Sequence, residues 1–331
     1  MQGRFMDLMA AADFLGPGAV EVDRYQTEIF DIVRRRGVFG QRIKQVPATG
    51  HPSRFFEETA IAAPTAAQGF VDPRNIAPTV LTALTPPLPT RVEMSVPLKA
   101  LVSQINYNLF DLEVTAQQSQ FAYLQAKDLA DAVDGLMRTH DVALWNGSDT
   151  SLLSPATPQY FGVIGQIGSA ANPQTVTVAK SSGNIVQTFK TAVAQMVSNS
   201  SYQVRPTAIY ANPMLLDLID QELKSQFNQV LNTVEITGGF TVKALSTQAG
   251  ELPLIPEWAL AYSGTLGSGA TLPAYIVTED LIEYHWLTDP NPRVFKLGLP
   301  NTLSQQQVVV KFGAPVVKGA NFAHYEVKVT D

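Results

Sequence analysis

The residue types used in catalysis and metal binding are present in this chain, but their spacing matches no catalytic or metal-binding motif. The four histidines include no pair at i, i+4 or at another ligand spacing; they are His51, His140, His285 and His324. The chain has no cysteine, which excludes disulfides and thiolate metal sites. We therefore predict no catalytic residue, no cofactor and no metal ion. The alternative is an α+β enzyme with scattered carboxylates, which would need a concave pocket holding acids of perturbed pKa.

The glycine clusters lack the features of phosphate-binding loops and of nucleophile elbows. Gly162, Gly165 and Gly168 have the spacing G-x-x-G-x-x-G, but no Gly-Lys-Ser/Thr follows and we expect no helix to begin there. The glycines between residues 264 and 269 do not fit G-x-S-x-G. We expect ordinary turns at both places.

The charged residues suggest contacts between copies of the chain. Residues 34–54 contain six basic residues and no acidic one, namely Arg34, Arg35, Arg36, Arg42, Lys44 and Arg54. Asp128, Asp131 and Asp134 follow one another at three-residue steps on a predicted helix. A basic loop and an acidic helix are complementary between neighbouring copies. The simpler interpretation is that each is a solvated surface.

The composition allows a large core and favours extensive contacts. Of the 331 residues, 45% are hydrophobic and 16% are charged, so much of the surface is uncharged and suited to cover by neighbouring subunits. The net charge of -6 argues against a protein that grips nucleic acid phosphates. We find no signal peptide pattern, and the uncharged runs 150–179 and 258–278 are too rich in Gly and Pro for membrane spans. The sequence predicts a soluble protein.

The longest predicted element is an amphipathic helix over residues 112–146. Its apolar residues recur at steps of three and four, and its length is roughly 50 Å. His140 lies on the apolar face, where a core histidine is expected. Before this helix, Val92, Met94 and Val96 alternate with polar residues as in a half-buried strand. We interpret residues 34–98, which include many prolines, as an extended two-stranded loop that leaves and rejoins the body.

The rest of the chain alternates helices and short strands, which indicates an α+β fold. We predict helices over 184–198 and from Pro213 to Leu223, and a buried strand over 207–210 between them. Short strands fill 230–300, with a hairpin tip at Gly238-Gly239. The predicted closing strands are 308–310, 316–317 and 325–329, with His324 beside the last as a second core histidine.

The order of these parts resembles that of the major capsid proteins of tailed bacteriophages, the Hong Kong 97 shell fold. The resemblance rests on the extended loop, the strand Arg91 to Lys99, and the long helix ending in Trp145-Asn146-Gly147. It continues with the Gly162-Val163 turn, the segment Pro206-Thr-Ala-Ile-Tyr-Ala-Asn-Pro213, and the strands around Val308 to Val317. The similarity covers nearly the whole chain as an order of elements.

The resemblance implies an N-terminal arm (1–33), an E-loop (34–98), a peripheral (P) domain (99–206 and 301–331) with the spine helix 112–146, and an axial (A) domain (207–300). The implied function is a non-enzymatic shell protein. It would form hexamers and pentamers of an icosahedral head that encloses double-stranded DNA without sequence-specific binding.

The implied partners are further copies of the chain, a portal protein, a separate scaffolding protein and, in some relatives, a decoration protein. The implied location is the virion capsid, and the host cytoplasm during assembly. The alternative within the same fold is the shell of an encapsulin nanocompartment, which encloses protein cargo.

Overall fold

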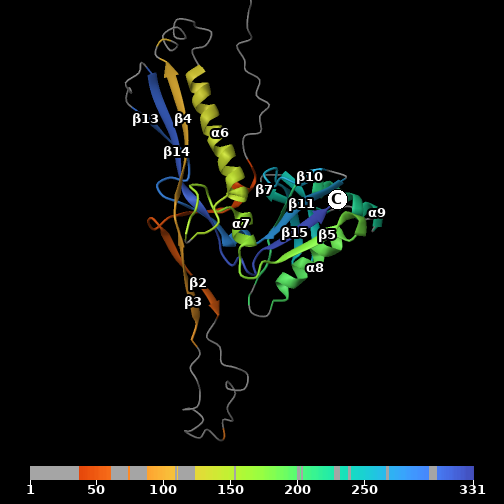
Figure 1. Cartoon of the computed structure of the whole chain (residues 1–331). Coiled ribbons are helices and arrows are strands. Elements are labelled where there is room, and N and C mark those ends of the chain that lie inside the picture. The colour runs from red at the N-terminus through yellow and green to blue at the C-terminus, as the bar shows by residue number, and fades with distance from the viewer. Residues whose placement is uncertain are drawn as a thin grey trace, which may run out of the picture.

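The computed structural model describes residues 37–60, 74, 88–108, 110, 124–152, 154–199, 202, 204–226, 232–237, 240–265, 268–297 and 304–331. These residues form a long sheet, a wide sheet and a two-stranded hairpin (Figure 1). Helix α6 (Leu124–Asn146) runs beside the long sheet, and the hairpin projects in the opposite direction. Helices α8 (Ile185–Val197) and α9 (Pro213–Gln226) pack against the wide sheet. The mixture confirms the predicted α+β class.

The long sheet is organised around β14 (Ser304–Val317). Residues 304–313 of β14 pair with β4 (Lys99–Asn108), and residues 306–310 pair on their other side with β13 (Arg293–Leu297). Residues 313–317 pair with β12 (Ile282–Trp286), which pairs in parallel with β1 (Lys44–Pro47). The prediction of two short strands at 308–310 and 316–317 is wrong. The strand continues through Gly313, because its pairing with β4 ends there and its pairing with β12 begins at the same residue. A glycine at this position also lets the Tyr284 side chain lie against the backbone.

The wide sheet has the order β5–β15–β11–β6–β9–β8–β7, with β10 also paired to β11. Its strands are β5 (Thr175–Ala179), β6 (Ala208–Ala211), β7 (Asn232–Thr237), β8 (Phe240–Thr247), β9 (Gly250–Pro256), β10 (Ser263–Thr265), β11 (Ser268–Val277) and β15 (Tyr325–Thr330). Short 3-10 turns follow β5 (Lys180–Ser182) and precede β12 (Glu279–Leu281). The antiparallel pair β7–β8 agrees with the predicted hairpin, although residues 238 and 239 lie outside the described residues.

At β6, both faces of the wide sheet are buried. Ile209 and Ala211 belong to a core with α8 and α9. Ala208 and Tyr210 face a second core that includes Trp145, at the end of α6. Burial on both faces explains why residues 208–211 form a continuous apolar run rather than an alternating one. The predicted strand and the two helices around it are confirmed.

The second core joins the long helix to both sheets. The ring centroid of Trp145 lies 4.2 Å from that of Phe39 in α2 (Phe39–Arg42), and 5.5 Å from those of Tyr210 and Tyr275. His140 is buried beside Tyr284, which confirms its interpretation as a core histidine. The part of the predicted 112–146 helix within the described residues is helical, and residues 112–123 lie outside them.

One predicted turn is a helix. The residues after Gly162 form α7 (Val163–Gly168), because Val163 and Ile167 are buried and the Gln166 side chain fixes the helix to the body. The Gln166 amide donates to the carbonyl oxygens of Phe161 and Pro315 at 2.6 and 3.0 Å, and its oxygen accepts from Val317 N–H at 2.9 Å. Tertiary packing therefore overrides the low helix propensity of Gly165 and Gly168, the two glycines within α7.

The sheets divide the chain differently from the predicted domain boundaries. Strands β12 and β13 lie within the predicted 207–300 segment, yet both pair with β14 in the long sheet. Strand β5 lies within the predicted 99–206 segment, yet it pairs with β15 in the wide sheet, and α8 packs there too. Strand β1 lies within the predicted loop 34–98 but belongs to the long sheet. The strand with which each of these strands pairs, rather than its place in the sequence, decides the sheet to which it belongs.

Candidate assembly surfaces

The projecting hairpin consists of β2 (Ser53–Ala60) and β3 (Thr90–Val96), and one face of it is fixed to the body at its root. Phe55 and Val96 pack with Ala314 and Val316 of β14. Gly319 N–H donates to the Glu57 carboxylate at 3.2 Å. A two-stranded ribbon is marginal by itself, so these contacts are what keeps the hairpin ordered within one subunit.

A buried polar network lies directly under this root. His285 Nδ1 is 2.9 Å from Ser53 Oγ, and its Nε2 is 3.1 Å from Glu283 Oε2. Lys318 Nζ donates to the same Glu283 oxygen at 2.6 Å. Burial alone would raise the pKa of Glu283, but the hydrogen bonds from Lys318 and His285 lower it below its ordinary value. Burial lowers the pKa of His285, which favours a neutral ring that accepts from Ser53 and donates to Glu283.

This network has the order serine, histidine, carboxylate that hydrolases use, and it is the arrangement closest to an active site that we find in the described chain. Ser53 is only 1% exposed, so a substrate carbonyl cannot approach its Oγ. The network instead joins the hairpin to β12. Sequence reasoning missed it, although the alternation of Glu283 and His285 on one strand placed both side chains on one face.

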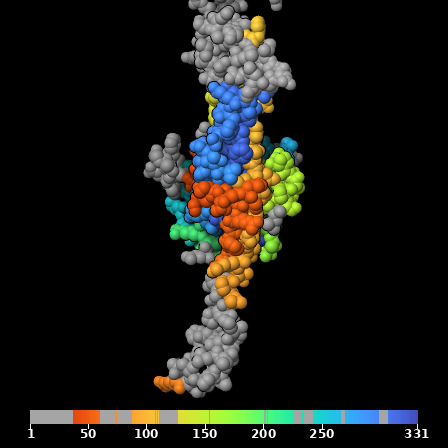
Figure 2. Space-filling view, turned by 90° about the vertical axis from the view of Figure 1, so that its left-hand side faces the viewer, coloured from red at the N-terminus to blue at the C-terminus, as the bar shows by residue number. Residues whose placement is uncertain are grey.

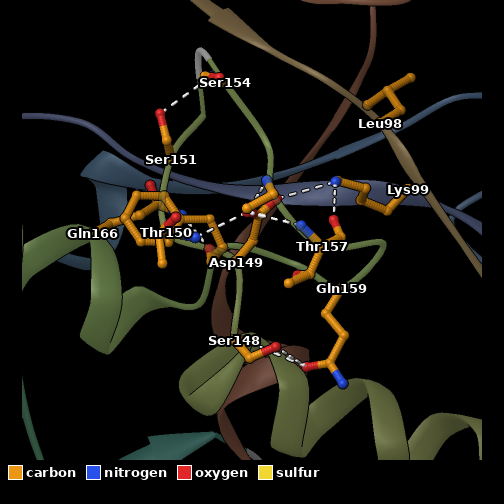
Figure 3. A network of polar contacts seen from close by, with 12 residues as sticks. Leu98, Lys99, Ser148, Asp149, Thr150, Ser151, Ser154, Thr157, Gln159 and Gln166 are labelled. Atoms are coloured by element: carbon orange, nitrogen blue, oxygen red, sulfur yellow. Dashed lines mark hydrogen bonds and ion pairs between the residues drawn. The ribbon is translucent and has the colours of Figure 1, made fainter.

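A second network fixes the other strand of the hairpin where β3 leads into β4 (Figure 3). Lys99 Nζ donates to Asp149 Oδ2 at 3.0 Å and to the Thr157 carbonyl oxygen at 2.6 Å. Asp149 Oδ1 accepts from the backbone N–H of Thr150 and Ala156, each at 2.8 Å. Burial would raise the pKa of Asp149, but these N–H groups and Lys99 lower it. The loop after α6 thus binds the start of β4.

The outer face of the hairpin carries one large exposed apolar side chain between two ion pairs. Phe56 is 70% exposed. Arg54 pairs with Glu93 at 3.2 Å, and Arg91 pairs with Glu58 at 3.1 Å, across the two strands. Exposed pairs of this kind contribute about 0–1 kcal/mol each. An aromatic residue exposed amid such charges is typical of a contact surface.

The outer face of β4, β14 and β13 is also unusually uncharged. Directly paired residues share a face, which gives three rows across the strands: Val102, Val310 and Arg293; Gln104, Val308 and Phe295; Asn106, Gln306 and Leu297. Val102, Phe295 and Leu297 are 54%, 40% and 47% exposed. On the opposite face, Val309 and Lys311 are buried. Figure 2 shows the exposed strands in blue next to the red and orange hairpin.

Within the described residues, no group of three or more His, Asp or Glu side chains could hold a metal ion. No described helix is long and apolar enough to cross a membrane.

Comparisons with known proteins give structural matches only. No protein-family model matches the chain, and no curated protein matches its sequence. The capsid of Myoviridae phage XM1 matches with a TM-score of 0.58 at 9% identity, covering 95% of this chain and 100% of that one. The capsid of a native GTA particle matches with a TM-score of 0.60 at 11% identity, covering 96% and 98%. The SrpI encapsulin of Synechococcus elongatus PCC 7942 matches with a TM-score of 0.59 at 10% identity, covering 96% and 94%.

This chain has the Hong Kong 97 shell fold. Each match extends over nearly the full length of this chain and of the matched chain. The shell fold therefore includes the long sheet, the wide sheet and the projecting hairpin together. The predicted resemblance is thereby confirmed at the level of fold.

Of the nine predicted contact residues in this shell-fold chain, Arg34, Arg35 and Arg36 lie outside the described residues. Three of the others are paired within the chain: Arg42 donates to both oxygens of Glu279 at 2.7 and 2.9 Å, Lys44 pairs with Glu283 at 3.3 Å, and Arg54 pairs with Glu93. The remaining three, Asp128, Asp131 and Asp134, lie on α6, where Lys127 pairs with Asp131 at 3.1 Å. Arg42 is half-buried and joins α2 to Tyr210 of the wide sheet and to Glu279.

Proposed function

We propose that this chain is the major capsid protein of a tailed bacteriophage. Copies would assemble into the hexamers and pentamers of an icosahedral head that encloses double-stranded DNA. The observation that carries this proposal is the full-length structural likeness to phage and GTA capsids. The exposed apolar surfaces of the hairpin and of β13 support it, since an isolated subunit would leave them in water.

The arrangement of the elements suggests a role for each part. The long sheet with α6 would be the P domain and its spine helix, and the wide sheet with α8 and α9 would be the A domain. The hairpin β2–β3 would be the described part of the E-loop within 34–98, with Phe56 on the face that meets a neighbouring subunit. Residues 1–33 would be the N-terminal arm.

The proposed role requires no catalysis. The Ser53–His285–Glu283 network is sealed from solvent and fixes the root of the hairpin. A net charge of -6 suits a wall that encloses DNA without holding its phosphates tightly. A portal protein, a separate scaffolding protein and an outer decoration protein are the partners we propose. Assembly would take place in the host cytoplasm and end in the virion.

An encapsulin-like shell is the second candidate, and one observation favours it. The SrpI encapsulin matches this chain with a TM-score of 0.59, close to the value for the GTA capsid. An encapsulin would enclose a protein cargo rather than DNA. The contents of the particle therefore separate the two candidates.

Electron microscopy of the chain expressed alone tests the shared part of the proposal. We expect shells, tubes or hexameric sheets, because the exposed apolar surfaces need partners. A chain that stays monomeric at high concentration would overturn both candidates. Particles purified from the native source then decide between them, since nuclease-protected DNA with a portal supports the phage capsid and an enzyme cargo supports the encapsulin.

A further inference from the structure

The orientation of the projecting hairpin depends on its root, and His285 of β12 lies at the centre of that root. Within the described residues, β2 and β3 pair only with each other. Ser53 Oγ at the start of β2 is 2.9 Å from His285 Nδ1, and the ring centroids of Phe55 and His285 are 6.0 Å apart. Val96, the partner of Ser53 in β3, packs on β14. These side chains hold the hairpin to its own subunit.

The hydrogen bonds at the root need a neutral imidazole ring. His285 Nε2 is 3.1 Å from Glu283 Oε2, and the pKa of that carboxyl lies below its ordinary value, so the carboxylate is ionised and accepts. Nε2 therefore carries the ring proton, which leaves Nδ1 to accept from the Ser53 hydroxyl. A protonated ring carries hydrogen on both nitrogens. The Ser53 hydroxyl, only 1% exposed, would then lose its acceptor.

The charges packed around the ring also oppose a second proton. Glu283 lies on the same strand and already pairs with two lysines, Lys318 after β14 at 2.6 Å and Lys44 of β1 at 3.3 Å. Protonated His285 would be a third cation on one carboxylate. Burial is the main cause that lowers the pKa of His285, and the charge of Lys318 adds to it, although Glu283 partly opposes them.

Two further titratable side chains at the root have partners of their own. Glu57 of β2 accepts from Gly319 N–H at 3.2 Å, and His51 Nδ1 accepts from Leu98 N–H at 3.3 Å. His51 is exposed, whereas His285 is buried. Of the two histidines at the root, His285 is therefore the one whose protonation the fold resists.

This resistance couples the hairpin to pH. Separation of the root would expose His285 to water, and its pKa would return toward the ordinary value of about 6.5. The closed hairpin binds this proton less readily than the open one, so acid favours opening. The ratio of open to closed hairpins should rise as the pH falls below about 6.5, by up to about tenfold per pH unit. Glu283 keeps its charge over the first part of this range because its pKa is lowered.

We propose that His285 is an acid-sensitive latch for the hairpin. When the ring is neutral it holds β2 to β12, and when it is protonated it lets the root separate from β12 and β14. The inference concerns a single chain, so it goes beyond the proposed shell function and can be tested on subunits that have not assembled. Acid would thereby change how the face that carries Phe56 meets a partner.

Thiol labelling measures the opening, since the chain has no cysteine of its own. Val96→Cys places one thiol in the buried root, where Val96 is 0% exposed. The full-length, unassembled subunit is labelled with 4,4′-dithiodipyridine between about pH 7.5 and about pH 5, and each rate is divided by the rate in urea at the same pH. We expect the normalised rate to rise below about pH 6.5 with a slope of at most one proton, which is about tenfold per pH unit.

His285→Asn provides the decisive comparison, because its amide oxygen can still accept from Ser53 but the side chain does not titrate. In this background the rise should disappear, whereas His51→Asn should keep it. His285→Gln serves if the asparagine variant does not fold by circular dichroism. Val193→Cys in α8, also 0% exposed, reports global unfolding and should label more slowly. A rate at Val96→Cys that ignores pH, that rises equally without His285, or that only equals the rate at Val193→Cys would overturn the latch. Whether the chain forms shells does not affect this result.

Discussion

Single buried carboxylates organise much of this molecule. Glu222 of α9 accepts from the N–H groups of Ile185 and Val186 at 2.9 and 3.0 Å, so it caps α8 in place of the local residue Asn184. Asp149 accepts from backbone N–H groups of the loop after α6, and Glu257 accepts from backbone N–H groups at the beginning of α2. Each carboxylate satisfies backbone donors that would otherwise be buried without a partner.

Two buried histidines should make the stability of the subunit sensitive to acid. Burial lowers the pKa of His324 to about 4, although its hydrogen bond to the Lys318 carbonyl partly opposes this. Burial and the nearby Lys311 charge lower the pKa of His140 to about 3. The unfolded chain gains these protons near pH 6.5 while the folded chain does not. The free energy of unfolding should therefore fall as the pH is lowered from about 6.5 to 4.

The variant His324→Gln isolates one of these protons. Urea denaturation of the unassembled subunit at several pH values should show that its free energy of unfolding depends less on pH, by about 1.4 kcal/mol per pH unit between pH 6 and 4.5. Glutamine keeps a donor for the Lys318 carbonyl oxygen but does not titrate. An unchanged slope would mean that His324 is not neutral in the folded state.

At the scale of elements, the end of α6 and the start of α7 cross at close range. Gly147 N–H donates to the Ala143 carbonyl, Gly162 N–H donates to the Gly147 carbonyl, and Ser148 bridges Phe161. A Cβ at Gly162 would overlap the carbonyl oxygen of Trp145. The backbone of Gly162 is ordinary, with φ of -65°. Close approach, rather than backbone freedom, requires glycine there.

We expect Gly162→Ala to destabilise the subunit by about 2–4 kcal/mol, because the two segments must separate to admit the methyl group. Gly168→Ala is the matched control. Its Cβ meets no atom within 4 Å, and alanine is the better helix former, so its stability should be unchanged or slightly raised. Thermal unfolding of both variants measures the difference in stability. Equal stabilities of the two variants would show that the crossing can admit a methyl group at position 162 without strain.

At the scale of the whole molecule, the surfaces that folding leaves exposed are those that assembly would cover. The hairpin presents Phe56 and the long sheet presents a face whose only charge in its three paired rows is Arg293. The core residues of both sheets are buried within one subunit. Folding and assembly should therefore respond to different substitutions.

Substitutions in the basic run at 34–36 test whether assembly can be impaired without unfolding the subunit. Reversing Arg34, Arg35 and Arg36 to Glu should leave the subunit folded by circular dichroism but strongly reduce shell yield by electron microscopy, since complementary charges on α6 would then repel. Adding Asp128→Lys, Asp131→Lys and Asp134→Lys to the same chain should restore part of the yield. Normal shells from the first variant alone would contradict the charge pairing.

The sequence by itself determined the elements whose cause is local. Apolar spacing predicted α8, α9, β6 and the described part of α6, because a helix or strand needs one apolar side wherever it packs. It also predicted the buried state of His140. The order of these elements was enough to predict the shell fold, which the structural matches confirm.

Only the tertiary structure decided which elements belong together. Strand β5 pairs with β15 near the end of the chain, and β12 pairs with β1 near the beginning of the described residues, so no local pattern assigns these strands to a sheet. The same holds for α7, whose Gln166 is bonded to β14, and for the Ser53–His285–Glu283 network, which joins positions more than 200 residues apart. Pairing and burial between distant segments are properties of the folded chain, and they set the surfaces through which we propose it assembles.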